Sequence, residues 1–337
     1  LILFPLLGVA TIKEISVNYS HPIVFLFFGG FVLALAIEKW NLHKRIALSI
    51  IKRTGIKSRQ VLLGFMIATA FLSMWISNTA TTIMMLPIGL SVLNVIQVDK
   101  KQTNRIGFLL LVSIAWSANI GGMMTLIGTP PNLILLGFLR EQLGQDIAFA
   151  NWLLIGVPTG VVLLTATFFV MSRFLPDINL FDRENVIEQE LNKLGKMSVP
   201  ERRVAIVFFF TALAWIVRPL IAKWLNLEAL SDTHIALICA VLLFIIPSGK
   251  TPKERILKWD DTSKLAWGIL ILFGGGLALA SAINSSGALE LVEDYLASLE
   301  ISNVLALIAI IAFIGIFVTE LVSNMALVAA TLPLILA

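Results

Sequence analysis

Apolar runs of spanning or near-spanning length dominate this sequence of 337 residues. A helix needs about 20 apolar residues to cross the hydrocarbon core of a bilayer. Inside lipid every backbone polar group needs an internal partner, which a helix supplies. The runs therefore predict an all-α polytopic membrane protein. They lie near 22–37, 61–98, 107–137, 152–172, 204–222, 233–247, 266–283 and 303–337.

Composition excludes a water-soluble globule. The chain is 58% hydrophobic and 14% charged, whereas soluble domains carry about 25% charged residues. A single cysteine, Cys239, excludes a disulfide framework. Both ends of the sequence are apolar, at 1–10 and 332–337, which predicts a fragment that lacks the two ends of a longer membrane protein.

Basic residues predict which loops face the cytoplasm. Of the 25 Lys and Arg residues, 21 lie within 39–59, 100–105, 173–203 and 250–264. Loops rich in Lys and Arg stay on the cytoplasmic side. The basic excess therefore reports topology in the cell membrane, and we expect no nucleic-acid partner.

The run 61–98 has basic residues on both flanks, so it enters and leaves on the same side of the membrane. It forms either two tight crossings or a re-entrant hairpin that turns inside the membrane. Its middle, 77–82, is polar and uncharged. Irregular backbone at this depth is tolerated only inside protein or beside a wet cavity, which favours the hairpin.

An internal repeat relates the two halves of the chain. Residues 73–78 match 319–324 at a shift of 246. The loop assignment gives the two copies opposite orientations, and such inverted repeats are typical of secondary transporters. Two further matches keep nearly the same shift: Leu86-Pro87 with Leu332-Pro333, and Phe28-Gly29-Gly30 with Phe273-Gly274-Gly275.

Polar side chains in the two copies indicate an ion site. Ser73, Ser77 and Asn78 are spaced so that their oxygens converge where a helix ends, and such oxygens suit a hard cation such as Na⁺. The alternative is that the hydroxyls bond back to their own helix.

Glu320 is the one ionisable residue placed well inside a run. It is a candidate for binding a cation, carrying a proton or accepting backbone hydrogen bonds.

Consecutive prolines in the segment 127–132 predict a broken helix. The second half of that helix begins near Pro131 or Asn132, where free N–H groups attract an anion. The alternative is a simple proline kink.

Two amphipathic segments, one within 42–53 and one within 289–299, predict helices lying in the cytoplasmic and outer interfaces, or ordinary solvated loop helices. Their apolar positions are Leu42, Ile46, Ile50 and Ile51, and Leu289, Val292, Leu296 and Leu299.

These motifs resemble the divalent-anion/sodium symporter family, which carries dicarboxylates, citrate or sulfate. The family has Ser-Asn-Thr at the tips of two opposed hairpins and a Gly-Ser/Thr-Pro-Pro-Asn-like break after the first. Here the first tip is Ser77-Asn78-Thr79 and the break is 128–132. The resemblance implies one Na⁺ at Ser73, Ser77, Asn78 and Gly128, and a second at Thr319, the Val322 carbonyl and Asn324. It also implies that the anion meets Asn78, Thr79, Thr129 and Asn324.

The resemblance further implies an elevator-type inverted-repeat transporter with two re-entrant hairpins, acting as a homodimer in the lipid bilayer. The transport domain would comprise 59–175, with the hairpin 61–98, the broken helix 107–137 and the helix 152–172, together with the truncated second hairpin 301–337. The scaffold would comprise 1–58 with the cytoplasmic arm and 203–300 with the outer arm. Residues 176–202 would form a cytoplasmic loop.

The sequence departs from the family pattern at two places. Met325 stands where the family usually has Thr, so one hydrogen bond to the anion is lost and the preferred anion stays open. The counterpart of Gly128 falls near position 374, so half of the second cation site is outside this sequence.

Rival functions are a sodium-independent anion exchanger and a cation/proton antiporter that uses Glu320. We expect no enzyme, because a Ser77 nucleophile would need a base, and no His or Lys is placed at depth.

Overall fold

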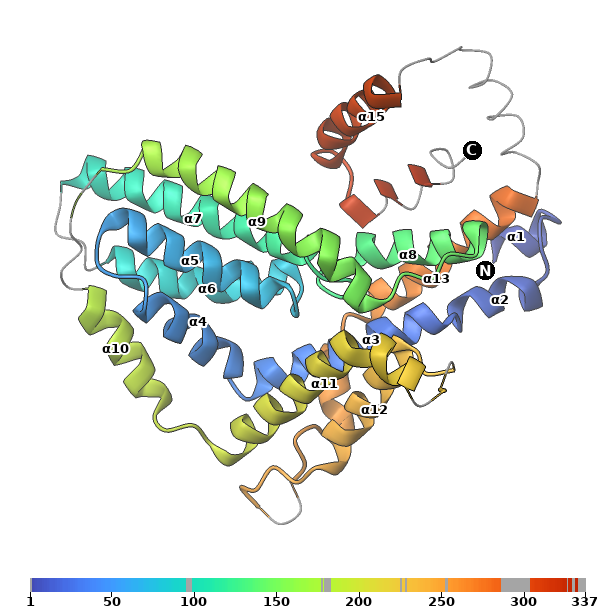
Figure 1. Cartoon of the computed structure of the whole chain (residues 1–337), viewed down its shortest axis with the longest axis horizontal. Helices are drawn as coiled ribbons and strands as arrows, with labels where there is room; N and C mark the ends of the chain where they lie inside the picture. The colour runs from blue at the N-terminus through green and yellow to red at the C-terminus, as the bar shows by residue number, and fades with distance from the viewer. Residues whose placement is uncertain are drawn as a thin grey trace. The chain divides into compact units, whose positions relative to one another are not determined.

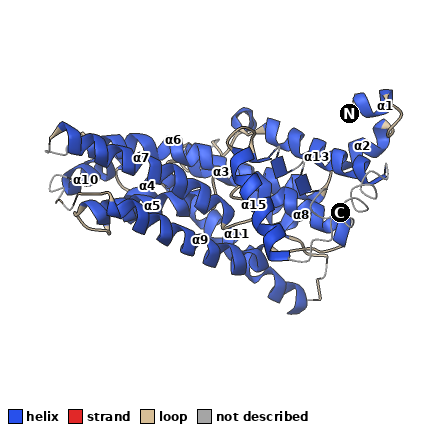
Figure 2. Cartoon of the chain, turned by 90° about the horizontal axis from the view of Figure 1, so that it is seen from above, coloured by secondary structure: helices blue, strands red, loops and turns tan. Residues whose placement is uncertain are grey.

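The computed structural model describes residues 2–94, 99–176, 178, 183–224, 226–227, 229–251, 254–285, 304–325, 327–328 and 331–332. Figures 1 and 2 show helices joined by loops and turns, and the extended pairing among the described residues is one isolated bridge between Pro247 and Arg255. The predicted all-α class is confirmed for the described part of the chain.

The helices follow the predicted apolar runs closely. In chain order they are α1 (Leu3–Leu6), α2 (Ile12–Tyr19), α3 (Pro22–Lys39), α4 (Leu42–Lys52), α5 (Ser58–Ser73), α6 (Asn78–Leu93), α7 (Lys100–Met123), α8 (Pro130–Leu143), α9 (Phe149–Arg173), α10 (Arg183–Leu194), α11 (Val199–Trp224), α12 (Asp232–Ile245), the 3₁₀ turn η1 (Trp259–Lys264), α13 (Trp267–Ser285) and α15 (Val304–Thr319).

Within the described residues, four stretches are long and apolar enough to cross a membrane. They are Ile12–Lys39, formed by α2 and α3, and the helices α7, α9 and α11. The run 61–98 instead forms two helices of 16 residues each, α5 and α6. Each is shorter than the roughly 20 residues that a full crossing needs.

The chain divides into two compact units. The larger unit contains residues 28–129 and 148–265, and the smaller contains 1–27, 130–147 and 266–337. The predicted division into transport and scaffold domains stays a prediction.

In the larger unit α5, α6, α7 and α9 lie side by side (Figures 1 and 2). Apolar residues at helical spacing on α5, α6 and α7 face one another, which buries a continuous core. Its fully buried members include Val61, Leu62, Phe65, Met66, Leu72, Met85, Val92, Leu110 and Ile114. This core holds the ends of α5 and α7 close together.

The amphipathic helix α4 packs its apolar face on α5 and is covered by α10. Arg45 joins it to α11 through a two-fold ion pair with the buried Glu201, at 2.5 Å and 3.2 Å. Burial lowers the pKa of His43 to about 4, so its ring is neutral and Nδ1–H donates to Ile37 O at 3.2 Å. The predicted helix is present, and its place in the membrane interface stays a prediction.

Two helices were not expected from the sequence. The segment 176–202, predicted as a loop, includes α10, which buries Ile187 in the core. Helix α2 (Ile12–Tyr19) lies before the first predicted apolar run, 22–37. A capping box explains α2, because the Glu14 carboxylate accepts the Thr11 N–H at 2.8 Å and the Thr11 hydroxyl accepts the Glu14 N–H at 3.3 Å. The predicted outer amphipathic segment, 289–299, lies outside the described residues.

In the smaller unit α13 packs against α2 and α8. Gly274 allows this close approach, because a Cβ there would lie 2.5 Å from the Tyr19 ring. Phe27 and Phe273 meet edge to face, with ring centroids 5.4 Å apart. Contact of α13 with α2 and with the start of α3 therefore depends on the second Phe-Gly-Gly sequence.

Candidate functional site

The polar sequence in the middle of 61–98 forms the tip between α5 and α6. Helix α5 ends at Ser73, the four residues Met74–Ser77 are not helical, and α6 begins at Asn78. The Ser77 hydroxyl accepts the N–H of Ala80 at 3.3 Å and caps α6. A serine at this position satisfies one of the N–H groups that a new helix leaves without a partner.

A second interruption, residues 124–129, separates α7 from α8 and confirms the predicted break. Helix α8 begins at Pro130, which fits a residue without an N–H at the start of a helix. The buried Thr125 hydroxyl donates to Met74 O and accepts the Gly128 N–H at 3.1 Å. One side chain thus ties the break to the tip.

The Asn78 amide is held at both ends. Ser73 Oγ donates to Asn78 Oδ1 at 2.9 Å, and Asn78 Nδ2 donates to Asn119 Oδ1 at 3.1 Å. Ser73 is fully buried at the end of α5, and Asn119 is exposed on α7. The amide oxygen therefore faces the buried end of α5, and its nitrogen faces α7.

Glycines let the backbones approach closely around this amide. A Cβ at Gly122 would lie 2.1 Å from Asn78 Oδ1. A Cβ at Gly128 would lie 2.5 Å from Gly122 O and 2.9 Å from Ser73 O. At Gly128 only a residue without a side chain fits, and a side chain at Gly122 would displace the Asn78 amide, so these oxygens gather in a space that glycine leaves open.

Helix ends give this cluster two electrostatic sides. The C-terminal ends of α5 and α7 carry partial negative charge, and the N-terminal end of α6 carries partial positive charge. Carbonyl, hydroxyl and amide oxygens without a formal charge suit a hard monovalent cation. The described residues contain no group of three or more His, Cys, Asp or Glu that would hold a metal ion. The arrangement therefore favours a cation at the ends of α5 and α7 and an anion near the start of α6.

Of the first predicted set, the structure brings Ser73, Ser77, Asn78 and Gly128 to one place in the larger unit. Thr79 is exposed one residue after Asn78, and Thr129 is half-buried one residue after Gly128. The contacts of these two hydroxyls with an anion stay a prediction.

Sequence reasoning missed two residues of this site, Asn119 and Thr125. Both are polar residues inside the apolar run 107–137, which was the available signal. Their partners Asn78 and Met74 lie 41 and 51 positions away. Only the packing of α7 against α5 and α6 reveals these pairs.

The second tip repeats the backbone of the first. Helix α15 ends at Thr319, Glu320–Ser323 is not helical, and helical backbone resumes at Asn324. In the first tip the N–H groups of Trp75 and Ile76 donate to Leu72 O, both at 3.0 Å. At the shift of 246, the N–H groups of Leu321 and Val322 donate to Val318 O, also at 3.0 Å.

Side chains of the second tip are open in the described part of the smaller unit. Asn324 and Glu320 are exposed, and Val322 is 44% exposed. Thr319 Oγ1 donates to Ile316 O at 2.8 Å, within its own helix. Such a back-bond was the alternative to a ligand role, and the binding of Na⁺ by Thr319 stays a prediction.

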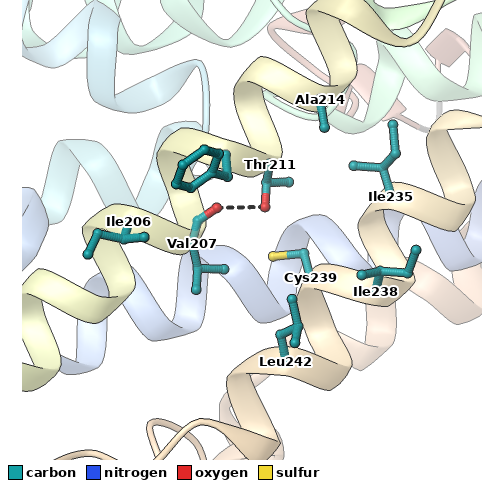
Figure 3. A pocket seen from close by; sticks show the side chains of 9 residues that line it. Ile206, Val207, Thr211, Ala214, Ile235, Ile238, Cys239 and Leu242 are labelled. Atoms are coloured by element: carbon teal, nitrogen blue, oxygen red, sulfur yellow. Dashed lines mark hydrogen bonds between the residues drawn. The ribbon is translucent and has the colours of Figure 1, made fainter. Parts of the chain in front are cut away.

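A separate pocket of about 430 Å³ lies between α11 and α12 (Figure 3). Its walls are apolar side chains, and its hydroxyl, that of Thr211, donates to Val207 O at 2.8 Å. A pocket lined by apolar side chains, whose one hydroxyl already donates to the backbone, is a poor site for a divalent anion. The tip of α5 and α6 is therefore the better candidate.

Comparison with known proteins identifies the family. The model of the sodium:sulfate symporter transmembrane region matches residues 1–337. The chain belongs to this symporter family. A sodium-dependent dicarboxylate transporter of Staphylococcus saprophyticus is 40% identical over 346 aligned residues, covering 99% of this chain and 67% of the relative. Its counterpart in Staphylococcus aureus is 42% identical, covering 99% of this chain and 66% of the relative.

The chain thus spans about two thirds of the length of these symporter relatives. Family membership and its helices of spanning length identify it as a multi-pass protein of the cell membrane. The resemblance inferred from the Ser-Asn-Thr tip and the Pro-Pro break is confirmed.

Proposed function

We propose that this protein carries out sodium-coupled symport of small divalent anions, with C4-dicarboxylates as the favoured class. The observation that carries the proposal is the cluster of uncharged oxygens around Asn78, placed at the ends of α5 and α7. The names of the two staphylococcal relatives, both sodium-dependent dicarboxylate transporters, support the same cation and the same anion.

The first Na⁺ is held by Ser73, Ser77, Asn78 and Gly128, through hydroxyl, amide and carbonyl oxygens. The second is held at the other tip by Thr319, the Val322 carbonyl and Asn324. Binding there would replace the bond of Thr319 to Ile316 O. Each bound cation adds positive charge beside the anion site, so the affinity for a divalent anion rises with Na⁺ concentration.

The carboxylates of the anion bind to Asn78, Thr79, Thr129 and Asn324. Met325, beside Asn324, has no hydroxyl to donate. This loss removes one hydrogen bond to the anion, and the preference for C4-dicarboxylates rests on the names of the two relatives. The N-terminal end of α6 supplies further N–H groups to the same carboxylates.

Transport proceeds by an elevator movement of the domain 59–175 and 301–337 against the scaffold 1–58 and 203–300, in a homodimer. The shortness of α5 and α6 supports a re-entrant hairpin within the moving part. The matching backbone of the two tips supports the inverted repeat on which the movement depends.

Uptake of labelled succinate by the complete protein in liposomes tests the function directly. We expect uptake under an inward Na⁺ gradient, no uptake when K⁺ replaces Na⁺, and competition by unlabelled dicarboxylates. Absence of uptake for succinate, citrate and sulfate under a Na⁺ gradient would overturn the proposal. Uptake that persists without Na⁺ would instead favour an exchanger, or an antiporter that uses Glu320.

Asn78→Ala tests the site. The variant removes a cation ligand and an anion donor together, so Na⁺-dependent uptake falls to background. Asn104→Ala is the matched control, because Asn104 is an exposed asparagine in the first turns of the same α7 whose end meets Asn78. Equal uptake by the two variants would contradict the assignment.

A further inference from the structure

The described residues around Asn78 include a second amide that neither the motif nor the repeat singles out. Asn119 lies on α7, one turn before Gly122, and its Oδ1 accepts the Asn78 Nδ2–H at 3.1 Å. Residues three apart on a helix share a face. Asn119 and Gly122 therefore form one socket for the Asn78 side chain, with an acceptor on one side and an open space on the other.

This socket decides which end of the Asn78 amide faces the cation. A carbonyl oxygen accepts hydrogen bonds and cannot donate, so Asn119 Oδ1 attracts the nitrogen of Asn78 and repels its oxygen. Asn78 Oδ1 is thereby turned toward Ser73 Oγ, 2.9 Å away. A reversed amide would place N–H groups where a cation needs oxygen.

From this geometry we infer that Asn119 is a positioning residue for the sodium site: it acts through Asn78, whose amide oxygen it aims at the first Na⁺. The inference rests on the proposed function, since it assumes that Asn78 binds Na⁺. Asn119 is exposed, so a substitution there removes the hydrogen bond without opening the core. Its role is separate from the fold, because the core of α5, α6 and α7 is built from other residues.

Two substitutions of similar size distinguish the effect of the Asn119 side-chain oxygen, which accepts the hydrogen bond, from the effect of the side-chain shape. Asn119→Leu keeps the shape and removes the acceptor, and Asn119→Asp keeps an oxygen that accepts from Asn78. The control is Asn104→Leu, the same substitution at an exposed asparagine on the same helix. The readout is thermal unfolding of the complete protein in detergent, measured against Na⁺ concentration with K⁺ keeping the ionic strength constant.

For Asn119→Leu we expect the half-saturating Na⁺ concentration to rise roughly three- to tenfold, the range that one hydrogen bond supplies. The melting temperature without Na⁺ stays at the wild-type value. Asn104→Leu keeps the wild-type Na⁺ dependence, and Asn119→Asp keeps or lowers the half-saturating Na⁺ concentration, because its carboxylate attracts the cation. In uptake, Asn119→Asp raises the half-saturating succinate concentration, because its carboxylate repels the anion.

Three outcomes overturn the inference. If Asn119→Leu keeps the wild-type Na⁺ dependence, Asn119 does not position the ligand. If Asn119→Asp is impaired as much as Asn119→Leu, the hydrogen bond runs in the opposite direction. If the wild-type protein shows no response to Na⁺, the proposed function and the inference fail together. A wild type that responds to Na⁺ without carrying succinate removes the proposed substrate and leaves the positioning test intact.

Discussion

The two helix breaks at Met74–Ser77 and Glu320–Ser323 share a backbone and differ in their surroundings. Side chains of α7 and its following loop hold the first, through Asn119 and Thr125. Among the described helices, none packs extensively against α15, which leads into the second. The comparison shows that a short Ser-Asn sequence is enough to fold a tip, and that at the first tip residues of α7 and its following loop also fix the side chains.

The largest expected contrast concerns glycines. A Cβ at Gly121 would lie 2.2 Å from Ala70 O, whereas a Cβ at Gly315 would meet nothing within 4 Å. Gly121→Ala therefore forces α5 and α7 apart and costs about 3 kcal/mol in the free energy of unfolding. Gly315→Ala is neutral or stabilises by about 0.5–1 kcal/mol. Unfolding of the complete protein by heat or denaturant measures both, and equal losses would show that α15 is also closely packed.

A smaller contrast concerns the second residue of each break. The Trp75 ring stacks on Phe149 with centroids 6.1 Å apart and meets the edge of Phe208 at 4.8 Å. Leu321, its counterpart at the shift of 246, is 89% exposed.

Trp75→Ala is expected to cost about 2 kcal/mol, below the 3–5 kcal/mol of a fully buried aromatic residue, because Trp75 is only half-buried. Leu321→Ala changes the free energy of unfolding by less than about 0.5 kcal/mol. Comparison of the two variants by thermal unfolding decides the point. A loss at Leu321 as large as that at Trp75 would break the comparison, since it would reveal a partner behind the second tip.

The smallest contrast concerns two threonines. Thr125→Val leaves Met74 O and the Gly128 N–H without their shared partner, which costs about 1–2 kcal/mol. Thr319→Val loses one bond within its own helix and is expected to change stability by less than about 0.5 kcal/mol. Denaturant unfolding without Na⁺ measures these changes in the free energy of unfolding apart from any effect on ion binding. A larger loss for Thr319→Val than for Thr125→Val would contradict the role of Thr125 in linking the two loops.

Local chemistry explains which features the sequence predicts well. Consecutive prolines remove two N–H donors, so the end of α7 and the start of α8 at Pro130 are visible in the sequence. Ser77 is a strong cap, so the start of α6 is visible as well. Both depend on residues only a few positions apart.

The features that the sequence does not predict depend on how the helices are positioned along one another. Asn119 meets Asn78 only because α7 packs against α6 at one particular height, and helical periodicity does not fix that height. Helix α10 has too few apolar residues to read as a span, yet it buries Ile187 against the core. Contacts between residues that lie 41 or more positions apart in the sequence are therefore visible only in the packed structure.

The Thr125 hydroxyl has a mechanical consequence. It bonds a carbonyl in one break and an N–H in the other, at once and with no water between them. A shift of either loop by more than about an ångström would therefore pull on the other or cost both bonds. The two loops are therefore expected to move together. A ligand that displaces one of them also displaces the other.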